Sequence, residues 1–282
     1  MPELPEVHTI TSDLKKHILD AVVKKVEIKA GFSVSPSAGV FKKKLVGRKI
    51  TDIHRVAKNI LLGLDSGDFL VIHLAMTGRL LFRKTGFKAD QWERVIFTLE
   101  KDGKIGELRY TDLRMFGKVK IINKAEYKTL QNKYGPDPIT ETFDHYRFLE
   151  LLQNKRTNIK NALLDQTVIS GIGNIYANDA LWIAKIHPGT KTSDITPPMA
   201  KNLLAAIRGI LNESIFNRGS TLDDKMYVDI FGKQGEHQNY FRIYGKAECP
   251  RCYIPVKFMK LNGRGTYFCE NCQLKTDQES LL

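Results

Sequence analysis

All four cysteines of the chain fall into two close pairs. Cys249 and Cys252 enclose Pro-Arg, Cys269 and Cys272 enclose Glu-Asn, and residues 253–268 separate the pairs. Two pairs at this separation are typical of a structural zinc ion held by four thiolates. Because four protein ligands leave no open position on the metal, we expect the zinc to hold structure and not to perform chemistry. Two disulfides are the alternative, which a reducing compartment disfavours.

The segment between the cysteine pairs predicts a β-hairpin. It reads YIPVKFMKLNGRGTYF, two β-prone runs joined at Asn262 and Gly263, and Asn-Gly is the strongest short hairpin signal. Arg264 follows the turn and is expected near the tip. An arginine at such a tip is usually only solvated, but one that a metal positions rigidly in a basic segment suits phosphate recognition.

The chain begins MPELPEV, with two prolines and two glutamates among its first six residues. Pro5 suits the first turn of a helix, and Glu6 would face the positive end of the helix dipole. These roles at the start of a helix account for Pro5 and Glu6 and do not explain Pro2 and Glu3.

Composition indicates a folded, strongly basic protein. The 282 residues are 42% hydrophobic and 27% charged, enough for two domains of ordinary size. Forty-four Lys and Arg against 31 Asp and Glu give a net charge of +13, which favours nucleic acid as the partner ahead of an anionic membrane surface. The sequence shows neither a membrane span nor a signal peptide, so we expect a cytoplasmic protein without a membrane partner.

The first half of the chain predicts one helix followed by many strands. Val7, Ile10, Leu14 and Ile18 recur at helical spacing and predict a helix over residues 5–19. Eight short β-rich runs follow, with turn residues and no helical pattern between them, which favours an antiparallel β-sandwich. The segment YGPDP, residues 134–138, then disfavours any continuing helix or strand.

The second half predicts helices. Four segments carry the pattern: HYRFLELLQNK, IKNALLDQ, IGNIYANDALWIAKI and PPMAKNLLAAIRGILNESIF. Residues 219–239 have little periodicity. A loop this long is commonly functional, and we interpret it as a mobile loop that covers the substrate, with plain disorder as the alternative.

Eight motifs in order along nearly the whole chain carry a family resemblance. They are MPELPEV, VAKNILL, HLAMTGRL, TDLRMFGKV, GPDP, GIGNIYANDALW, IYGK and the cysteine hairpin with GRGT. In these motifs the chain closely resembles the formamidopyrimidine-DNA glycosylases, bacterial base-excision repair enzymes related to endonuclease VIII.

The resemblance implies an α+β fold, a monomer, and damaged double-stranded DNA bound in a basic cleft between two domains. It implies an N-terminal catalytic β-sandwich domain flanked by helices over residues 1–134. A helical helix-two-turn-helix domain with the lesion loop follows over 135–245, and a zinc-finger hairpin over 246–282. One structural Zn²⁺ ion is the only cofactor implied.

Pro2 and Glu3 gain a role from the resemblance. In the family Met1 is removed, so Pro2 presents a free secondary amine, and α-amino groups have a pKa of about 7.7–8.0. Such an amine can attack the sugar C1′ as a nucleophile and form an iminium that drives elimination of the 3′ and then the 5′ phosphate. Glu3 is the implied proton donor for opening of the deoxyribose ring.

The remaining implied site residues contact DNA. Lys58 and Arg264 match residues that bind phosphate and assist the two eliminations. Met76, Arg114 and Phe116 match the residues that fill the space left by a base turned out of the helix. Arg114 and Phe116 are two positions apart, so in an extended chain they project the same way.

A helix-two-turn-helix is implied over residues 159–181. Lys155 and Lys160 are interpreted as contacts to the DNA backbone, and Asn174 opens the second helix, where free amides favour an anion or where its side chain caps the helix. Gly171 and Gly173 would let the backbone approach a phosphate closely.

Two segments depart from the family pattern. The first cysteine pair lacks the usual glycine after its second cysteine and has Pro250 inside the pair, which puts the turn geometry in doubt and leaves the ligands intact. The segment FKADQWERV, residues 87–95, lacks a histidine that often helps to bind DNA, so that contact is expected to be lost or replaced.

The sequence therefore predicts a bifunctional DNA glycosylase and AP lyase for oxidised purines such as 8-oxoguanine and formamidopyrimidines. If the protein is an enzyme, the alternative is an endonuclease VIII-like glycosylase that acts on oxidised pyrimidines. A damaged-DNA-binding protein without catalysis is the alternative outside them, and the presence of Pro2, Glu3 and Lys58 argues against it.

Overall fold

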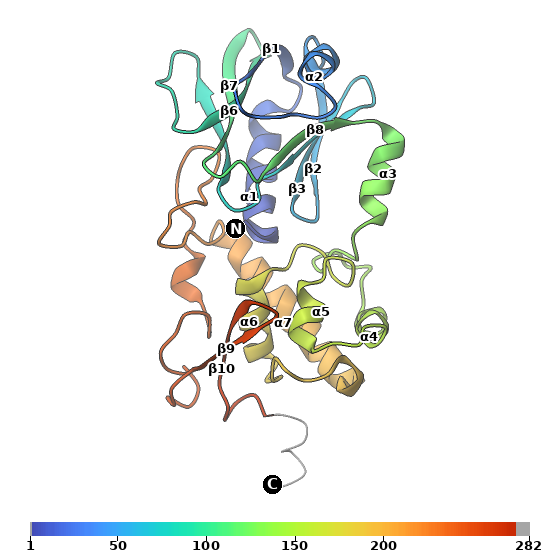
Figure 1. Ribbon diagram of the computed structural model, residues 1–282, viewed down its shortest axis with the longest axis vertical. Helices are drawn as coiled ribbons and strands as arrows, with labels where there is room; N and C mark the ends of the chain where they lie inside the picture. The colour runs from blue at the N-terminus through green and yellow to red at the C-terminus, as the bar shows by residue number, and fades with distance from the viewer. Residues whose placement is uncertain (1, 275–282) are drawn as a thin grey trace. The chain divides into compact units, whose positions relative to one another are not determined.

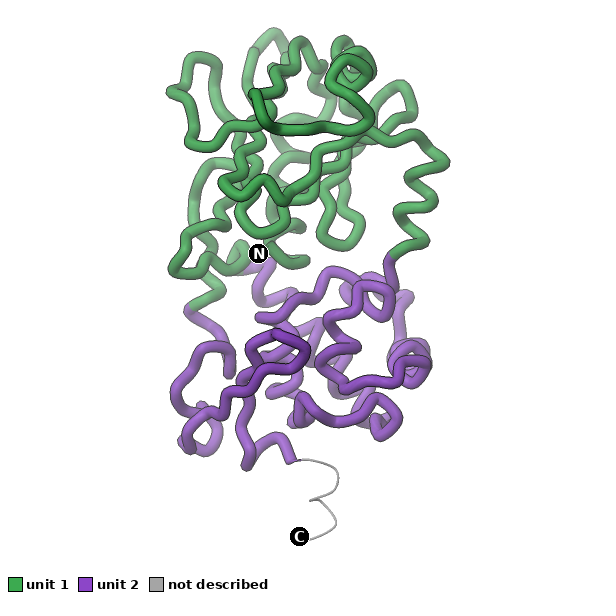
Figure 2. The backbone as a smooth tube through the Cα atoms, in the orientation of Figure 1, with its two compact units in different colours: residues 1–133, 217–238 green, residues 134–216, 239–282 purple. Residues whose placement is uncertain are grey.

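The computed structural model describes residues 2–274, and these divide into two compact units (Figures 1 and 2). Unit 1 comprises residues 1–133 and 217–238, and unit 2 comprises residues 134–216 and 239–282. The segment 217–238, which contains most of the loop that the sequence assigned to the second domain, therefore belongs to unit 1. The hairpin was expected as a third domain over residues 246–282; its described residues, 246–274, are part of unit 2, and the rest lie outside the described residues.

Unit 1 is an antiparallel β-sandwich, as predicted. One sheet has the strand order β1-β6-β7-β5 and the other β2-β3-β4-β8, and all their pairings are antiparallel. The strands span Val22–Ile28 (β1), Ile50–Val56 (β2), Asn59–Leu64 (β3), Phe69–His73 (β4), Gly78–Lys84 (β5), Glu93–Lys101 (β6), Lys104–Asp112 (β7) and Lys118–Ile122 (β8). Alternate apolar residues of both sheets, such as Leu62, Leu70, Phe97 and Leu108, fill the space between them.

Helix α1, Leu4–Ile18, is buried along the apolar stripe that predicted it and packs on β2 and β3 (Figure 1). Two further helices were not predicted: α2, Ala38–Leu45, and α3, Lys124–Asn132. Both begin at caps visible in the sequence, since Ser37 accepts a hydrogen bond at the start of α2 and Asn123 forms a capping box at the start of α3. Their helices are only two or three turns long, too short for periodicity to stand out.

Unit 2 is helical apart from one hairpin. Its α-helices span His145–Gln153 (α4), Ile159–Leu164 (α5), Asn174–Ile183 (α6) and Pro197–Phe216 (α7), with a 3-10 turn at Thr192–Asp194 (η1). A further 3-10 turn, η2, His237–Tyr240, spans the point in the chain, between residues 238 and 239, where unit 1 ends and unit 2 resumes. Strands β9, Lys257–Leu261, and β10, Arg264–Phe268, pair antiparallel. Asn262 and Gly263 both have positive φ, 46° and 73°, as the predicted two-residue turn requires.

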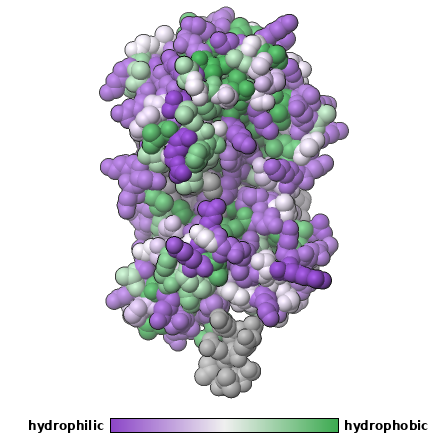
Figure 3. Space-filling model, in the orientation of Figure 1, coloured by the Kyte–Doolittle hydropathy of each residue, from purple (hydrophilic) through white to green (hydrophobic). Residues whose placement is uncertain are grey.

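The surface agrees with the basic, polar composition. The face drawn in Figure 3 is mainly hydrophilic with small, scattered apolar patches. Among the described residues, no helix has both the length and the apolar character needed to cross a membrane.

Candidate active site and DNA-binding residues

The start of α1 holds both residues that the sequence singled out as reactive. Pro2 and Glu3 are buried, and Glu3 is only 3% exposed. The carboxylate of Glu6 accepts a hydrogen bond from the Glu3 N–H at 2.7 Å and another from the Ser220 N–H at 2.8 Å. Glu6, to which the sequence gave only a dipole role, thus joins the head of α1 to the segment 217–238.

A second anchor between α1 and this segment lies further along the helix. The guanidinium of Arg218 forms ion pairs with Asp13 of α1 and with Asp229. These two carboxylates raise the pKa of Arg218, with burial opposing them, so the guanidinium stays charged. These contacts attach residues 217–238 to unit 1, and the interpretation of residues 219–239 as a mobile loop that covers the substrate stays a prediction.

Lys58 lies in the turn between β2 and β3 and is 8% exposed. His73 lies beside it on β4, opposite Asn59. Burial, and then the charges of Lys58 and other lysines, lower the pKa of His73, so this imidazole is neutral at neutral pH. The positive charge at this turn is therefore carried by Lys58 and not by His73, and it lies in a partly dehydrated setting that suits contact with a phosphate.

The three expected void-filling residues lie on two neighbouring loops of unit 1. Met76 precedes β5, while Arg114 and Phe116 follow β7, the strand that pairs with β5. Met76 and Phe116 are 39% and 56% exposed, and Leu113 and Met115, on the same loop as Phe116, are exposed as well, so several large apolar side chains are accessible on these two loops. The guanidinium of Arg114 lies 4.5 Å from the centre of the Phe116 ring.

The two side chains thus lie together, but not for the reason that the sequence suggested. Residues 113–117 form a loop in which Met115 has a positive φ of 56°, and not an extended strand. The stacking of Arg114 on Phe116 brings them to the same side.

Asp112, which the sequence analysis did not single out, holds both loops. Its carboxylate is fully buried and accepts hydrogen bonds from the Thr77 and Tyr110 hydroxyls at 2.5 and 2.9 Å. It also accepts the backbone N–H groups of Arg114 and Gly117 at 3.2 and 2.9 Å. Burial and the neighbouring Asp112 charge raise the pKa of Tyr110, so its hydroxyl remains a donor.

We expect Asp112→Asn to destabilise unit 1 by about 2 kcal/mol, because an amide cannot accept all four hydrogen bonds and leaves a buried donor without a partner. It should slow excision of a damaged base from duplex DNA more than cleavage at a ready-made abasic site, which needs less extrusion. Single-turnover rates on the two duplexes test this. Asp65→Asn, at an exposed turn, is the matched control. Equal slowing on both substrates would show that Asp112 supports the fold without a specific role for the loops that carry Met76 and Phe116.

In unit 2 the hairpin tip is fixed by residues of α5 and α6. Arg264 is exposed, and within residues 2–274 its guanidinium forms no ion pair or hydrogen bond. The carbonyl of the next residue, Gly265, accepts hydrogen bonds from the Lys160 ammonium at 2.8 Å and the Asn174 side-chain amide at 3.0 Å. The hairpin therefore presents a positioned, available cation.

This arrangement corrects the interpretation of Lys160 as a direct contact to the DNA backbone. Lys160 is 0% exposed, and its ammonium also bonds to the side chains of Asn178 and Thr266 at 3.2 and 2.7 Å. A buried ammonium with these three partners stabilises the hairpin, and it cannot contact a phosphate without breaking those hydrogen bonds.

Lys155 and Asn174 also differ from expectation in detail. The Lys155 ammonium is 2.8 Å from an Asp165 carboxylate oxygen, so a phosphate would have to share it. Helix α6 begins at Asn174 with Gly173 as its N-cap, so Asn174 is not the cap. Of the two glycines named from the sequence, Gly171 has a positive φ of 86° and Gly173 does not.

The four cysteine sulfurs lie within 4.8 Å of one another. Three of their pairwise Sγ–Sγ distances are 3.4, 3.6 and 3.8 Å. A tetrahedral ion with Zn–S bonds of about 2.3 Å separates its sulfurs by about 3.8 Å, so the four side chains fit such a site. The cysteines are not disulfide-bonded, and this cluster can hold one metal ion.

Trp182 of α6 and Arg251 attach the cysteine cluster to the helices. The indole N–H of Trp182 donates to the Cys249 sulfur at 3.4 Å. The Arg251 guanidinium lies 3.7 Å from the Trp182 ring centre and donates to the carbonyls of Trp182 and Ile183 at the end of α6. Arg251 lies between Cys249 and Cys252, so the unusual first pair uses its inner residue to cap a helix.

Tyr253 explains how the first cysteine pair manages without a glycine. It has a positive φ of 60°, the conformation that glycine adopts at no steric cost. Its N–H donates to the Cys249 carbonyl at 2.8 Å, which closes the turn around the metal ligands. The missing glycine therefore changes the energy of the turn and not its form.

We expect Tyr253→Gly to stabilise the hairpin by about 0.5–1 kcal/mol, because it removes the strain of a left-handed side chain while the Tyr253 ring is 76% exposed. The measurement is the rate of metal release to a chelator, which should fall. Tyr253→Ala is the matched control, since it removes the same ring and keeps the strained Cβ. An equal gain from both variants would contradict the explanation.

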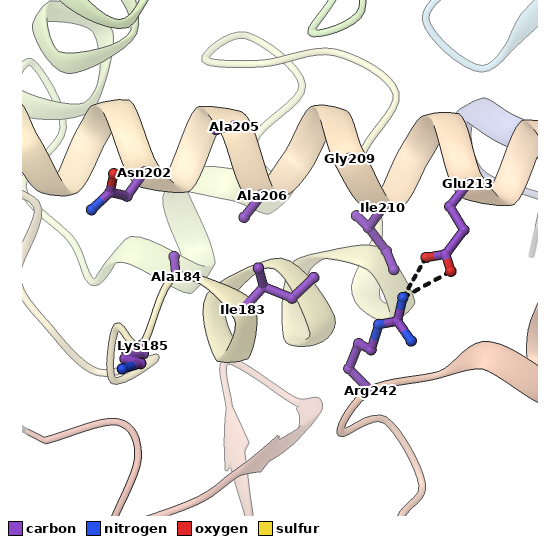
Figure 4. Close-up of a pocket in the computed structure, with 10 residues that line it drawn as sticks. All are labelled: Ile183, Ala184, Lys185, Asn202, Ala205, Ala206, Gly209, Ile210, Glu213 and Arg242. Atoms are coloured by element: carbon purple, nitrogen blue, oxygen red, sulfur yellow. Dashed lines mark hydrogen bonds and ion pairs between the residues drawn. The ribbon is translucent and has the colours of Figure 1, made fainter. Parts of the chain in front are cut away.

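Two carboxylates of unit 2 fix the chain that leads into the hairpin. The buried Asp179 carboxylate accepts the N–H groups of Arg242, Ile243 and Tyr244 at 2.9 Å each. The Arg242 guanidinium points toward Glu213 of α7 and donates to both carboxylate oxygens at 2.8 Å, at one end of a groove of about 720 Å³ (Figure 4). Neither carboxylate was singled out from the sequence.

Fold and site together define a DNA-processing enzyme of the base-excision type, and comparison with known proteins agrees. Residues 1–119 match the model of the formamidopyrimidine-DNA glycosylase N-terminal domain, and residues 134–226 match that of the formamidopyrimidine-DNA glycosylase H2TH domain. The chain belongs to the formamidopyrimidine-DNA glycosylase family, and it is a DNA glycosylase of base-excision repair.

Individual relatives match over almost their whole length. The formamidopyrimidine-DNA glycosylase of Chloroflexus aurantiacus is 38% identical, with 99% of each chain covered. That of Mycoplasma genitalium is 34% identical over 99% of this chain and 98% of its own. The Lactococcus lactis Fpg structure in complex with abasic-site DNA is 32% identical, with a TM-score of 0.88 over 97% of this chain and 100% of its own. A Lactococcus lactis complex with FAPY-dG-containing DNA gives 0.87 at the same identity and coverage.

Proposed function

We propose that the chain excises oxidised purines from duplex DNA and then cleaves the strand, with Pro2 as the nucleophile after removal of Met1. The observation that carries the proposal is the pair of exposed apolar side chains, Met76 and Phe116, on loops that the buried Asp112 holds in place. Rigid apolar wedges suit insertion into a base stack, which a glycosylase needs in order to reach its target. The complexes of the Lactococcus lactis relative contain abasic and FAPY-dG DNA, in line with this substrate class.

In the proposed reaction the Pro2 nitrogen bonds to C1′ of the flipped nucleotide, and the bond from C1′ to the base breaks with its electrons leaving on the base. The N–H proton of the amine passes to the departing base, which leaves neutral. Glu3 gives a proton to the ring oxygen O4′ as the sugar opens, which leaves an iminium between Pro2 and C1′. The iminium draws electrons from the C2′–H bond, so loss of that proton expels the 3′ phosphate. A second elimination expels the 5′ phosphate.

The cations have separate roles in this proposal. Lys58 binds a phosphate beside the sugar and assists the first elimination, and Arg264 binds a phosphate and assists the second. Arg114 donates to the base left without a partner. Asn174 and, by sharing its Asp165 ion pair, Lys155 contact the DNA backbone. Lys160 does not touch DNA and acts by fixing the hairpin that carries Arg264.

We assign zinc as the metal of the four cysteines, because an all-thiolate tetrahedral set with sulfurs at these spacings suits it. The ion cross-links the two ends of the hairpin and leaves no position for a substrate. The enzyme acts as a monomer in the cytoplasm, where a reducing environment keeps the four thiolates available.

The test compares strand cleavage of an 8-oxoguanine:C duplex with that of a thymine glycol:A duplex under single-turnover conditions at one salt concentration, because phosphate contacts make affinity salt-dependent. We expect faster cleavage of the 8-oxoguanine duplex. Preference for thymine glycol would indicate the endonuclease VIII-like alternative. Binding without cleavage, even of an abasic-site duplex, would indicate a damaged-DNA-binding protein.

A further inference from the structure

A cavity of about 260 Å³ lies at the end of the β1-β6-β7-β5 sheet, beside the last turn of α1. Its apolar lining includes Ile18, Phe82 and Leu99. The sequence analysis used Ile18 only to predict α1 and did not single out Phe82 or Leu99, and the proposed reaction uses none of the three. Pro2 lies at the other end of α1, which is 15 residues or about 22 Å long, so the cavity is separate from the reacting end of unit 1.

Three lysines that line this cavity lie on the core-facing side of the sheet. Lys84, Lys101 and Lys104 share their strand faces with Leu80, Phe97 and Leu108, which are all buried in the sandwich core. At these positions an apolar residue would extend the core. Instead, the core-facing side of the sheet ends in three lysines, which line the cavity together with its apolar residues.

The charges of these lysines are only partly balanced within unit 1, where Asp20 interacts electrostatically with Lys101 but forms its ion pair with Lys49. Lys101 lies directly opposite Lys104 in the β6–β7 pairing, and like charges at such a position are unfavourable. Within residues 2–274 none of the three ammonium groups forms an ion pair, whereas Arg83 nearby is paired with Asp90. Asp102, in the connecting turn, is the one acidic residue that lines the cavity. The cavity therefore attracts a ligand with more than one negative charge.

The size of the cavity further limits the kinds of ligand that fit it. Sites that enclose a whole cofactor or nucleotide measure about 300–1,000 Å³, whereas this one is smaller and accommodates a single large side chain. A DNA phosphate would form ion pairs with the lysines but would leave the apolar lining of the cavity uncovered. A ligand that joins an apolar group to adjacent carboxylates satisfies both parts.

We propose that this cavity is a docking site for an acidic peptide segment of a partner protein. The segment inserts one aromatic or large aliphatic side chain against Phe82 and Leu99. Its neighbouring carboxylates then lie against Lys84, Lys101 and Lys104. A repair enzyme that holds such a segment at one end of α1 keeps its reactive amine, at the other end, available to DNA.

The test measures binding of a fluorescein-labelled peptide, several aspartates followed by one phenylalanine, to the full-length enzyme by fluorescence anisotropy. We expect saturable binding that weakens at least about tenfold when the phenylalanine is replaced by alanine. The double variant Lys101→Glu/Lys104→Glu should weaken it by about tenfold or more. The matched control, Lys42→Glu/Lys43→Glu on α2, makes the same charge change elsewhere on unit 1 and should change the affinity by less than about twofold.

Two measurements distinguish peptide docking at this cavity from binding of the DNA backbone by its lysines. Both double variants should cleave an abasic-site duplex at the wild-type rate, and an undamaged duplex should not displace the peptide. Displacement by DNA, or a parallel loss of duplex affinity in Lys101→Glu/Lys104→Glu, would show that the lysines bind DNA backbone and would overturn the proposal. Equal binding of the phenylalanine and alanine peptides would also overturn it.

A measurement on the wild-type protein covers the case in which a variant folds poorly. In a sample with ¹³C-labelled isoleucine methyl groups, the peptide should shift the resonances of Ile18 and Ile105, both of which line the cavity. The resonance of Ile60, buried in β3, should stay in place. Unchanged Ile18 and Ile105 signals at saturating peptide would refute docking at this site.

Discussion

A variant that retains Met1 is expected to lose strand cleavage by at least about 10³-fold on both lesion and abasic-site DNA. Insertion of one leucine between Met1 and Pro2 achieves this, because a bulky second residue blocks removal of Met1. The proline nitrogen is then part of an amide, and its lone pair is delocalised into the carbonyl group and unavailable for attack on C1′. The measurement is the single-turnover rate of strand cleavage.

DNA binding provides the control for this variant. Lys58, Arg114, Asn174 and Arg264 remain in place, so affinity for lesion DNA should survive in part. Lys58→Ala makes the complementary change: it keeps the free amine and should slow the eliminations while still forming the covalent intermediate. Normal cleavage by the Met1-retaining enzyme would exclude Pro2 as the nucleophile.

Replacing Cys269 with serine is expected to remove the metal and lower the affinity for duplex DNA by about 10²-fold or more. The reason is that β9 and β10 bury little of their own surface, whereas a structural zinc ion contributes about 10–16 kcal/mol of binding free energy to the domain that holds it. Without it, Arg264 loses the position that Lys160 and Asn174 help to fix. Metal content and DNA affinity measured on one preparation test this.

Unit 1 should remain folded in the same variant, because its core is separate from the cysteine cluster. The far-ultraviolet circular dichroism of the β-sandwich is therefore the control. Full DNA affinity in a metal-free Cys269→Ser protein would contradict the role given to the hairpin.

The sequence predicted those parts of the fold whose signals are local and strong. The stripe from Val7 to Ile18 predicted α1, and Asn262-Gly263 predicted the turn of the metal hairpin, because spacing and positive φ act within a few residues. Short α2 and α3 were missed, since a helix of two or three turns shows too few repeats to define a period.

The functional residues that sequence analysis missed or misplaced depend on contacts between distant segments. Lys160 was interpreted as a contact to the DNA backbone from its place in the implied helix-two-turn-helix, yet its partners Gly265 and Thr266 lie over a hundred positions away. Asp112 stands inside a motif that was quoted, but its role requires Thr77, which β5–β7 pairing brings beside it. Residues 217–238 follow the helices in sequence but pack with unit 1 through Glu6 and Arg218.

The most direct test of the central claim, that the Pro2 amine attacks the sugar, is to locate the covalent adduct. The wild-type enzyme is incubated with abasic-site DNA and sodium borohydride, which reduces the iminium to a stable bond, and the protein is then digested and its DNA-bearing peptide sequenced by mass spectrometry. The account predicts that the DNA is joined to the N-terminal peptide, at Pro2, with Met1 absent. An adduct on an internal lysine such as Lys58, or an adduct formed with Met1 still attached, would contradict it.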